Sequence, residues 1–163
     1  MSATNQTDQI IATFASEAHT YERMSGAVAH LLSQILSSDG LTFHSITHRR
    51  KEVASLSKKV ARPDKAYQTL DEITDLAGIR VTTYFSEDVD RVARLIEQEF
   101  LIDKTNSIDK RAVLDPDKFG YQSLHYVAQF NSNRSQLVEY KNYSGEKFEI
   151  QVRSILQDRK SVV

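Results

Sequence analysis

Cysteine is absent from this chain of 163 residues, so it has no disulfide bond, no thiolate metal site and no thiol redox chemistry. No stretch approaches the ~20 apolar residues of a membrane-spanning helix. The N-terminus lacks the basic start and apolar run of a signal peptide. The net charge of -1 gives no global signal for nucleic-acid or membrane binding. We therefore expect a soluble, cytoplasmic protein.

A chain of this length forms one domain and buries roughly two-thirds of the surface that it exposes when unfolded. Its charges are unevenly distributed. Basic side chains are concentrated in residues 48–65, where the acidic residues are Glu52 and Asp64.

Apolar residues recur at helical spacing over residues 8–37, which predicts an amphipathic helix, with Gly26 as the place where it would break. The same reasoning predicts three shorter helices and five strands, which together give an α/β or α+β sheet covered by helices. The expected helices are 50–61, 64–70 and 86–100, and the expected strands are 41–47, 79–85, 108–114, 121–130 and 147–153.

The segment FGYQSLHY, Phe119–Tyr126, alternates in the manner of a strand that leaves a turn. One face of this strand would present Tyr121, Ser123 and His125. An aromatic ring beside hydrogen-bonding groups suits a nucleobase with its sugar and phosphates. An edge strand with a solvated polar face explains the pattern equally well, so this segment alone does not decide.

Three segments, in this order and spacing, resemble the synthetase domain of the RelA/SpoT family, which makes the alarmone (p)ppGpp. They are ITDLAGIRV (Ile73–Val81), FGYQSLHY and FEIQVR (Phe148–Arg153). The resemblance covers about Leu41–Leu156. It implies a nucleotidyltransferase-like mixed sheet of about five strands flanked by helices. We expect residues 1–40 to form an N-terminal helical region and residues 41–157 the synthetase domain.

The resemblance implies a GTP pyrophosphokinase, an enzyme that transfers pyrophosphate from ATP to the 3′-hydroxyl of GDP or GTP and releases AMP. Such a transfer needs cations for the triphosphate, a metal ion and a pocket that orients the hydroxyl. The family's Mg²⁺ ligands fall on Asp75 and Glu149, and Glu149 could also orient or deprotonate the hydroxyl. The family's ATP-binding pattern falls on Arg49, Lys51, Ser55 and Lys59.

The expected acceptor site combines aromatic, polar and basic residues. Tyr121 would stack on guanine, and His125 would lie near the sugar or phosphates. The complete expected set is Lys118, Tyr121, Ser123, His125, Gln151 and Arg153. Arg80 also lies in a family motif, but we interpret it as a buried structural arginine.

Without the resemblance, these residues have simpler explanations. The basic residues that begin at Arg49 would form a solvated helix face. Asp75 would be a helix cap or turn residue, and Glu149 an exposed strand position.

The chain departs from longer relatives at two places. None of its five histidines is followed by Asp, so we expect no metal-binding hydrolase domain, only a small single-domain synthetase. After Gln157 the chain reads DRKSVV and lacks the Trp-containing continuation of relatives. Because one reading frame of a common sequencing adapter encodes DRKSVV, we expect residues 158–163 to be a non-native tail and the domain to be incomplete. A natural short tail is the alternative.

Two other functions remain open. Some small relatives are toxins that pyrophosphorylate the 3′ end of tRNA, and the basic segment 48–65 is compatible with that acceptor. A non-catalytic nucleotide-binding regulatory domain is the other. The expected partners are ATP and GDP or GTP, with no membrane, and the resemblance implies a homo-oligomer.

Overall fold

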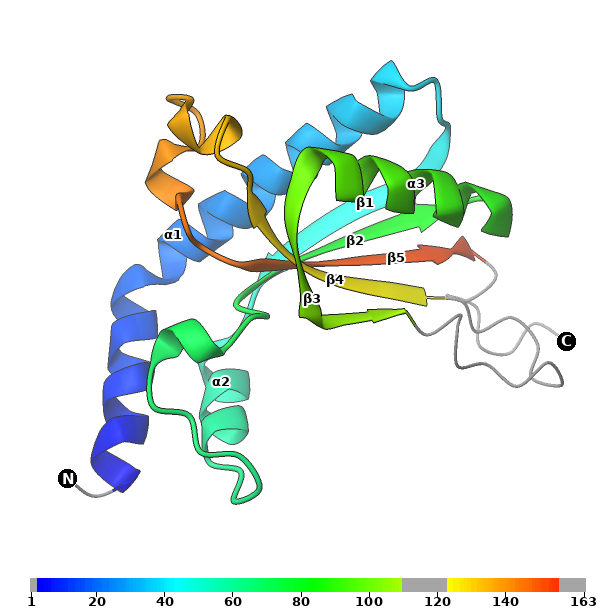
Figure 1. The fold of residues 1–163 in the computed structure, drawn as a ribbon. Coiled ribbons are helices and arrows are strands. Elements are labelled where there is room, and N and C mark those ends of the chain that lie inside the picture. Colours follow the sequence, from blue (N-terminus) through cyan, green and yellow to red (C-terminus); the bar gives the residue numbers. More distant parts are fainter. Residues whose placement is uncertain (1–2, 110–122, 156–163) are drawn as a thin grey trace, which may run out of the picture.

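The computed structural model describes residues 3–109 and 123–155, which form a five-stranded sheet with helices packed on it (Figure 1). The strand order is β1-β2-β5-β4-β3, in which β2 and β5 are parallel and the other neighbours are antiparallel. This mixed sheet confirms the expected fold class. The strands are β1 (Phe43–Arg50), β2 (Ala77–Thr83), β3 (Phe100–Asp109), β4 (Ser123–Phe130) and β5 (Phe148–Ser154).

The sheet has one apolar face and one polar face, because its strands alternate. In β5, Phe148, Ile150 and Val152 are buried, whereas the intervening residues are half-buried. Helices α1 (Ala3–Ser38) and α3 (Ser86–Glu99) pack against the sheet and contact each other, and α2 (Val53–Val60) follows β1. No helix within residues 3–109 and 123–155 is long and apolar enough to span a membrane.

The long N-terminal helix is continuous, so the expected break at Gly26 is wrong. Met24 and Val28, on either side of the glycine, are fully buried and hold the helix against the sheet. Gly26 lies where α1 crosses β1: a Cβ atom at this position would be 3.5 Å from Cε1 of His48. Tertiary packing therefore outweighs the ~1 kcal/mol that a glycine costs inside a helix.

Two predictions between β1 and β2 need correction. Strand β1 continues to Arg50, so helix α2 begins at Val53 and not at residue 50. The short helix expected over residues 64–70 is absent. The chain turns there, the backbone N–H of Gln68 donates to Oε2 of Glu72 at 3.0 Å, and only a 3-10 turn forms at Leu70–Glu72.

The strand expected over residues 108–114 begins earlier, because β3 follows α3 directly. The Phe100 ring packs against Phe130 and Phe148, with centroids 6.1 and 5.7 Å away, which fixes the start of the strand in the core. An irregularity after Asp103, whose Oδ1 accepts the N–H groups of Thr105 and Asn106, interrupts the strand pattern. Residues 110–114 lie outside the described residues.

Candidate functional site

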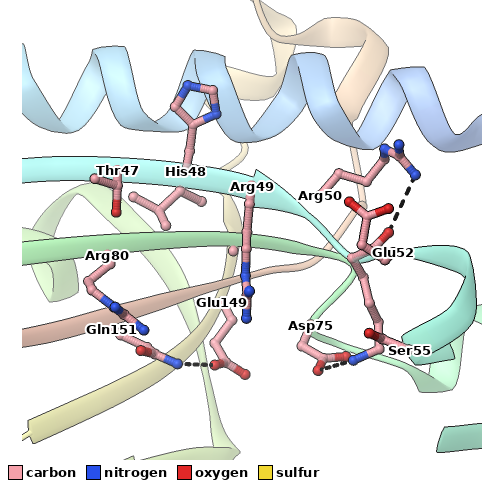
Figure 2. A pocket seen from close by; sticks show the side chains of 13 residues that line it. Thr47, His48, Arg49, Arg50, Glu52, Ser55, Asp75, Arg80, Glu149 and Gln151 are labelled. Atoms are coloured by element: carbon pink, nitrogen blue, oxygen red, sulfur yellow. Dashed lines mark hydrogen bonds and ion pairs between the residues drawn. The ribbon is translucent and has the colours of Figure 1, made fainter. Parts of the chain in front are cut away.

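A pocket of about 440 Å³ opens on the polar face of the sheet, where β1, β2 and β5 lie side by side (Figure 2). Its walls combine basic side chains, carboxylates and small polar groups. The polar residues that line it are Thr47, His48, Arg49, Arg50, Lys51, Glu52, Ser55, Asp75, Arg80, Glu149 and Gln151. The side chains of His48 and Arg50 point toward α1, where they contact Ser25 and Glu22 (Figure 2).

Strand register brings distant parts of the sequence to this pocket. Gly78 pairs with Arg49 on one side and with Glu149 on the other, and Arg80 pairs with Gln151. Paired residues of adjacent strands point to the same face of a sheet. Because Gly78 has no side chain, the floor between Arg49 and Glu149 stays open, and Figure 2 shows both side chains directed away from α1.

Asp75 lies in the loop before β2 and pairs with two lysines from two different elements. Lys51 Nζ donates to Oδ2 at 3.0 Å, and Lys59 Nζ donates to Oδ1 at 3.1 Å. Burial disfavours the charged carboxylate, but the hydrogen bond from Lys51 and the charge of Lys59 outweigh it and lower the pKa of Asp75. Asp75 is therefore a carboxylate at neutral pH.

Side chains of β5 and β4 contact the carboxylate of Glu149. Gln151 Nε2 donates to Oε1 of Glu149 at 3.1 Å, and His125 Nδ1 lies 3.6 Å from the same oxygen. The interaction with His125 lowers the pKa of Glu149; burial and the nearby charge of Asp75 oppose this effect, and Gln151 adds to it. Both expected metal ligands are thus ionised and within electrostatic reach of each other.

The residues expected to bind ATP lie around the junction between β1 and α2. Arg49 is exposed on the last part of β1, and Ser55 lines the pocket from α2. Lys51 lies outside the helix, so the expected helix 50–61 does not carry it together with Ser55 and Lys59. Lys59, on α2, reaches the site through Asp75.

Arg80 is exposed and lines the pocket, so its interpretation as a buried structural arginine is wrong. Its neighbours Ile79 and Val81 are buried on the apolar face of β2. Strict alternation places the residue between them on the polar face. That alternation was the signal that could have identified Arg80 as a site residue. Figure 2 shows Arg80 and Gln151 on neighbouring strands beside the pocket.

The remaining acceptor residues are placed less centrally. Ser123 pairs with Arg153 at the far end of the β4–β5 ladder, and neither lines the described pocket. Ser123 is only 5% exposed, and its Oγ has no hydrogen-bond partner among the described residues. Lys118 and Tyr121 lie outside the described residues.

The family defined as a region found in RelA/SpoT proteins matches residues 48–162. Among curated proteins, the chain is similar to the GTP pyrophosphokinase YwaC of Bacillus subtilis, at 30% identity over 115 residues, covering 68% of this chain and 50% of that protein. The GTP pyrophosphokinase YjbM of the same organism is 28% identical over 116 residues, covering 68% and 49%. The chain therefore spans about half the length of the curated relatives it matches.

A solved structure has the same fold. The small alarmone synthetase 2 from Bacillus subtilis superposes with a TM-score of 0.66 at 26% identity, covering 90% of this chain and 74% of that one. The mixed sheet described above is thus the fold of a known alarmone synthetase.

Proposed function

This chain belongs to the RelA/SpoT family, and we propose that it transfers pyrophosphate from ATP to the 3′-hydroxyl of GDP or GTP and releases AMP. One observation carries the proposal: a single pocket gathers Arg49, Lys51, Asp75 and Glu149, the basic and acidic groups that such a transfer needs. Both curated relatives are GTP pyrophosphokinases. Solved structures of the small alarmone synthetase 1 from Bacillus subtilis are bound to its product pppGpp and to AMPCPP.

The donor nucleotide binds at the junction of β1 and α2. Lys51 and Lys59 meet the triphosphate as movable point charges, and Ser55 adds a hydroxyl donor. Arg49 and Arg80 lie on the same sheet face and bind the nucleotide through planar guanidinium groups, which stack on a base or grip phosphate oxygens. Holding the donor in place is a large part of catalysis in phosphoryl-type transfers, because the protein contributes mainly position and charge.

Asp75 and Glu149 fit Mg²⁺. Both are ionised oxygen donors that line one pocket, and Mg²⁺ is commonly held by one or two carboxylates together with substrate phosphates. Among the described residues no three His, Asp or Glu side chains form an all-protein metal cage, which agrees with a site completed by a substrate. Bound there, Mg²⁺ supplies charge neutralisation at the phosphate under attack.

The acceptor approaches from the β4 and β5 side of the pocket. Glu149 orients the 3′-hydroxyl and accepts its proton, and Gln151 and His125 hold the carboxylate in place. Arg153 contacts acceptor phosphates, and Ser123 adds a polar contact. Tyr121 stacks on the guanine, and Lys118 adds a further phosphate contact.

A transfer assay tests the proposal. The protein is incubated with γ-labelled ATP, Mg²⁺ and GDP, GTP or bulk tRNA, and labelled products are separated. We expect label in guanosine tetra- or pentaphosphate. Asp75→Asn reduces this transfer by about 100-fold or more, because it removes a metal ligand. Lys58→Met is the control, since Lys58 is exposed on α2 beside Lys59 and does not pair with Asp75.

The other outcomes of the assay decide between the remaining functions. Label that enters tRNA alone replaces the guanosine acceptor with an RNA 3′ end. No label in any acceptor, from a protein that melts cooperatively, leaves a nucleotide-binding regulatory domain and overturns the proposed transfer.

A further inference from the structure

Both carboxylate oxygens of Asp75 are taken by lysines. Lys51 Nζ lies 3.0 Å from Oδ2, and Lys59 Nζ lies 3.1 Å from Oδ1. The side chain of Lys51 is only 16% exposed, that of Lys59 26% and that of Asp75 28%. The two ion pairs are therefore shielded from solvent more than typical surface pairs. A divalent cation that binds Asp75 lies close to both ammonium groups, whose positive charges repel it unless they move away.

The backbones of the two lysines are held in place, whereas their side chains can rotate and so move the ammonium groups. The Lys51 N–H donates to the carbonyl of Leu76 at 2.8 Å, which ties the β1–α2 junction to the Asp75 loop. Lys59 lies beside Val60, which is buried and fixes the end of α2. A lysine carries its charge on a flexible four-carbon stem with rotatable donors, so each ammonium group exchanges one anion for another while the backbone stays in place.

Glu149 is held differently. The described contacts of its carboxylate, from Gln151 and His125, both use Oε1. Within residues 3–109 and 123–155, no lysine contacts Oε2. Of the two expected metal ligands, Asp75 is therefore the one whose oxygens are both paired with lysines.

We infer that Lys51 and Lys59 are exchangeable counter-ions of Asp75. The phosphates of a nucleoside triphosphate draw both ammonium groups away, and the carboxylate then becomes available to a divalent cation. The inference rests on the proposed nucleotide site. It predicts that metal and nucleotide binding are coupled through the lysines and that the coupling acts equally in both directions. The lysines have two functions, which are to bind phosphate and to keep the metal from Asp75 until phosphate is bound.

The first test measures Mn²⁺ binding without nucleotide, by the electron paramagnetic resonance signal of the free ion. Lys51→Met and Lys59→Met each free one oxygen of Asp75, and we expect them to bind Mn²⁺ about 3- to 10-fold more tightly than the parent. Lys58→Met removes the same charge from the same helix without freeing Asp75 and gives a smaller gain. Lys59→Arg keeps the cation and behaves like the parent.

The second test runs in the opposite direction, with AMPCPP and EDTA so that no metal takes part. Asp75→Asn removes the negative charge that attracts both lysines, and titration calorimetry should show AMPCPP binding about 3- to 10-fold tighter than in the parent. Glu149→Gln is the charge-matched control, because Glu149 does not bind these lysines, and its gain is smaller. Thermal denaturation of every variant confirms that it is folded.

The inference is overturned if Lys51→Met and Lys59→Met bind Mn²⁺ no more tightly than Lys58→Met. It is also overturned if Asp75→Asn binds AMPCPP no more tightly than Glu149→Gln. Neither binding test uses an acceptor, so the results of both tests do not depend on whether the protein transfers pyrophosphate. Positive binding results without transfer overturn only the proposed function, and transfer without these binding differences overturns only the exchange of counter-ions.

Discussion

Glu149 of β5 is the Cα partner of Gly78 on the neighbouring parallel strand β2. Asp75 comes shortly before Gly78 in the chain, so this register brings two carboxylates to one pocket. A shift of β5 by one residue would turn Glu149 to the apolar face and place Phe148 or Ile150 in the pocket. The register of one strand pair therefore decides whether the site exists.

Arg80 is an exposed residue of the pocket, and its removal should separate binding from stability. Arg80→Ala is expected to weaken AMPCPP binding by about 10-fold, because it removes a guanidinium group from the pocket wall. The melting temperature should stay close to that of the parent, since the side chain is exposed. Titration calorimetry and thermal denaturation measure the two effects. Arg94→Ala, an exposed arginine on α3, is the control, and equal affinity in both variants would contradict the prediction.

His125 should control the pH at which Glu149 becomes active. The pKa of Glu149 is lowered, and the interaction with His125 is the largest cause. His125→Ala therefore raises this pKa, and Glu149 is protonated at a higher pH than in the parent. We expect the acid limb of the pH–rate profile for transfer to move to higher pH.

The position of the acid limb is read independently of the overall rate, which falls if His125 also contacts the acceptor. Gln151→Ala should move the limb in the same direction by a smaller amount, because its hydrogen bond is a lesser cause of the lowered pKa. A limb that stays in place or moves to lower pH in His125→Ala would show that His125 does not stabilise the charged carboxylate.

Glu146 should destabilise the fold as the pH rises. Burial raises its pKa above the ordinary 4.5, and the hydrogen bond from the Tyr21 hydroxyl, at 3.3 Å, offsets this only in part. A carboxyl with a raised folded-state pKa contributes stability below its unfolded pKa, and this contribution is lost as the pH rises through the folded value. Glu146→Gln removes the loss and keeps an acceptor for Tyr21.

We therefore expect Glu146→Gln to raise the melting temperature relative to the parent at about pH 8 but little at about pH 4. Melting curves across this range measure the difference. Glu139→Gln, an exposed position in the same connection, controls for the change in net charge. A gain that is constant with pH would mean that ionisation of Glu146 is not its source.

Phe148 should be the largest contributor to stability next to the site. It is fully buried, and its ring lies 5.7 Å from Phe100 and 5.4 Å from Phe130. Phe148→Ala is expected to cost about 3–5 kcal/mol of unfolding free energy, and Phe148→Leu less, as measured by urea denaturation. Phe85→Leu, at a position that is 65% exposed, should change stability by less than about 0.5 kcal/mol. Similar losses at both positions would argue against this aromatic core.

Period-two and helical patterns predicted the elements whose buried face follows the local alternation of apolar and polar residues. Phe148, Ile150 and Val152 are buried on one face of β5, within the expected strand 147–153, and α3 spans Ser86–Glu99, close to the expected helix 86–100. The start of β3 was missed because it follows a helix without a loop and because residues 103–107 are polar. Its position depends on pairing with β4 and on the ring contacts of Phe100, which no local pattern encodes.

For the site residues too, some properties follow from the sequence and others only from the tertiary structure. The sequence alone determined which chemical groups are present: basic residues before α2, carboxylates at Asp75 and Glu149, and the motifs that identify the family. The tertiary structure alone decided that Arg80 lies in the pocket and that Asp75 holds Lys51 and Lys59 at once. The physical reason is that residue types are local properties, whereas the charges that surround a carboxylate depend on strand register and on the packing of α2 against α1.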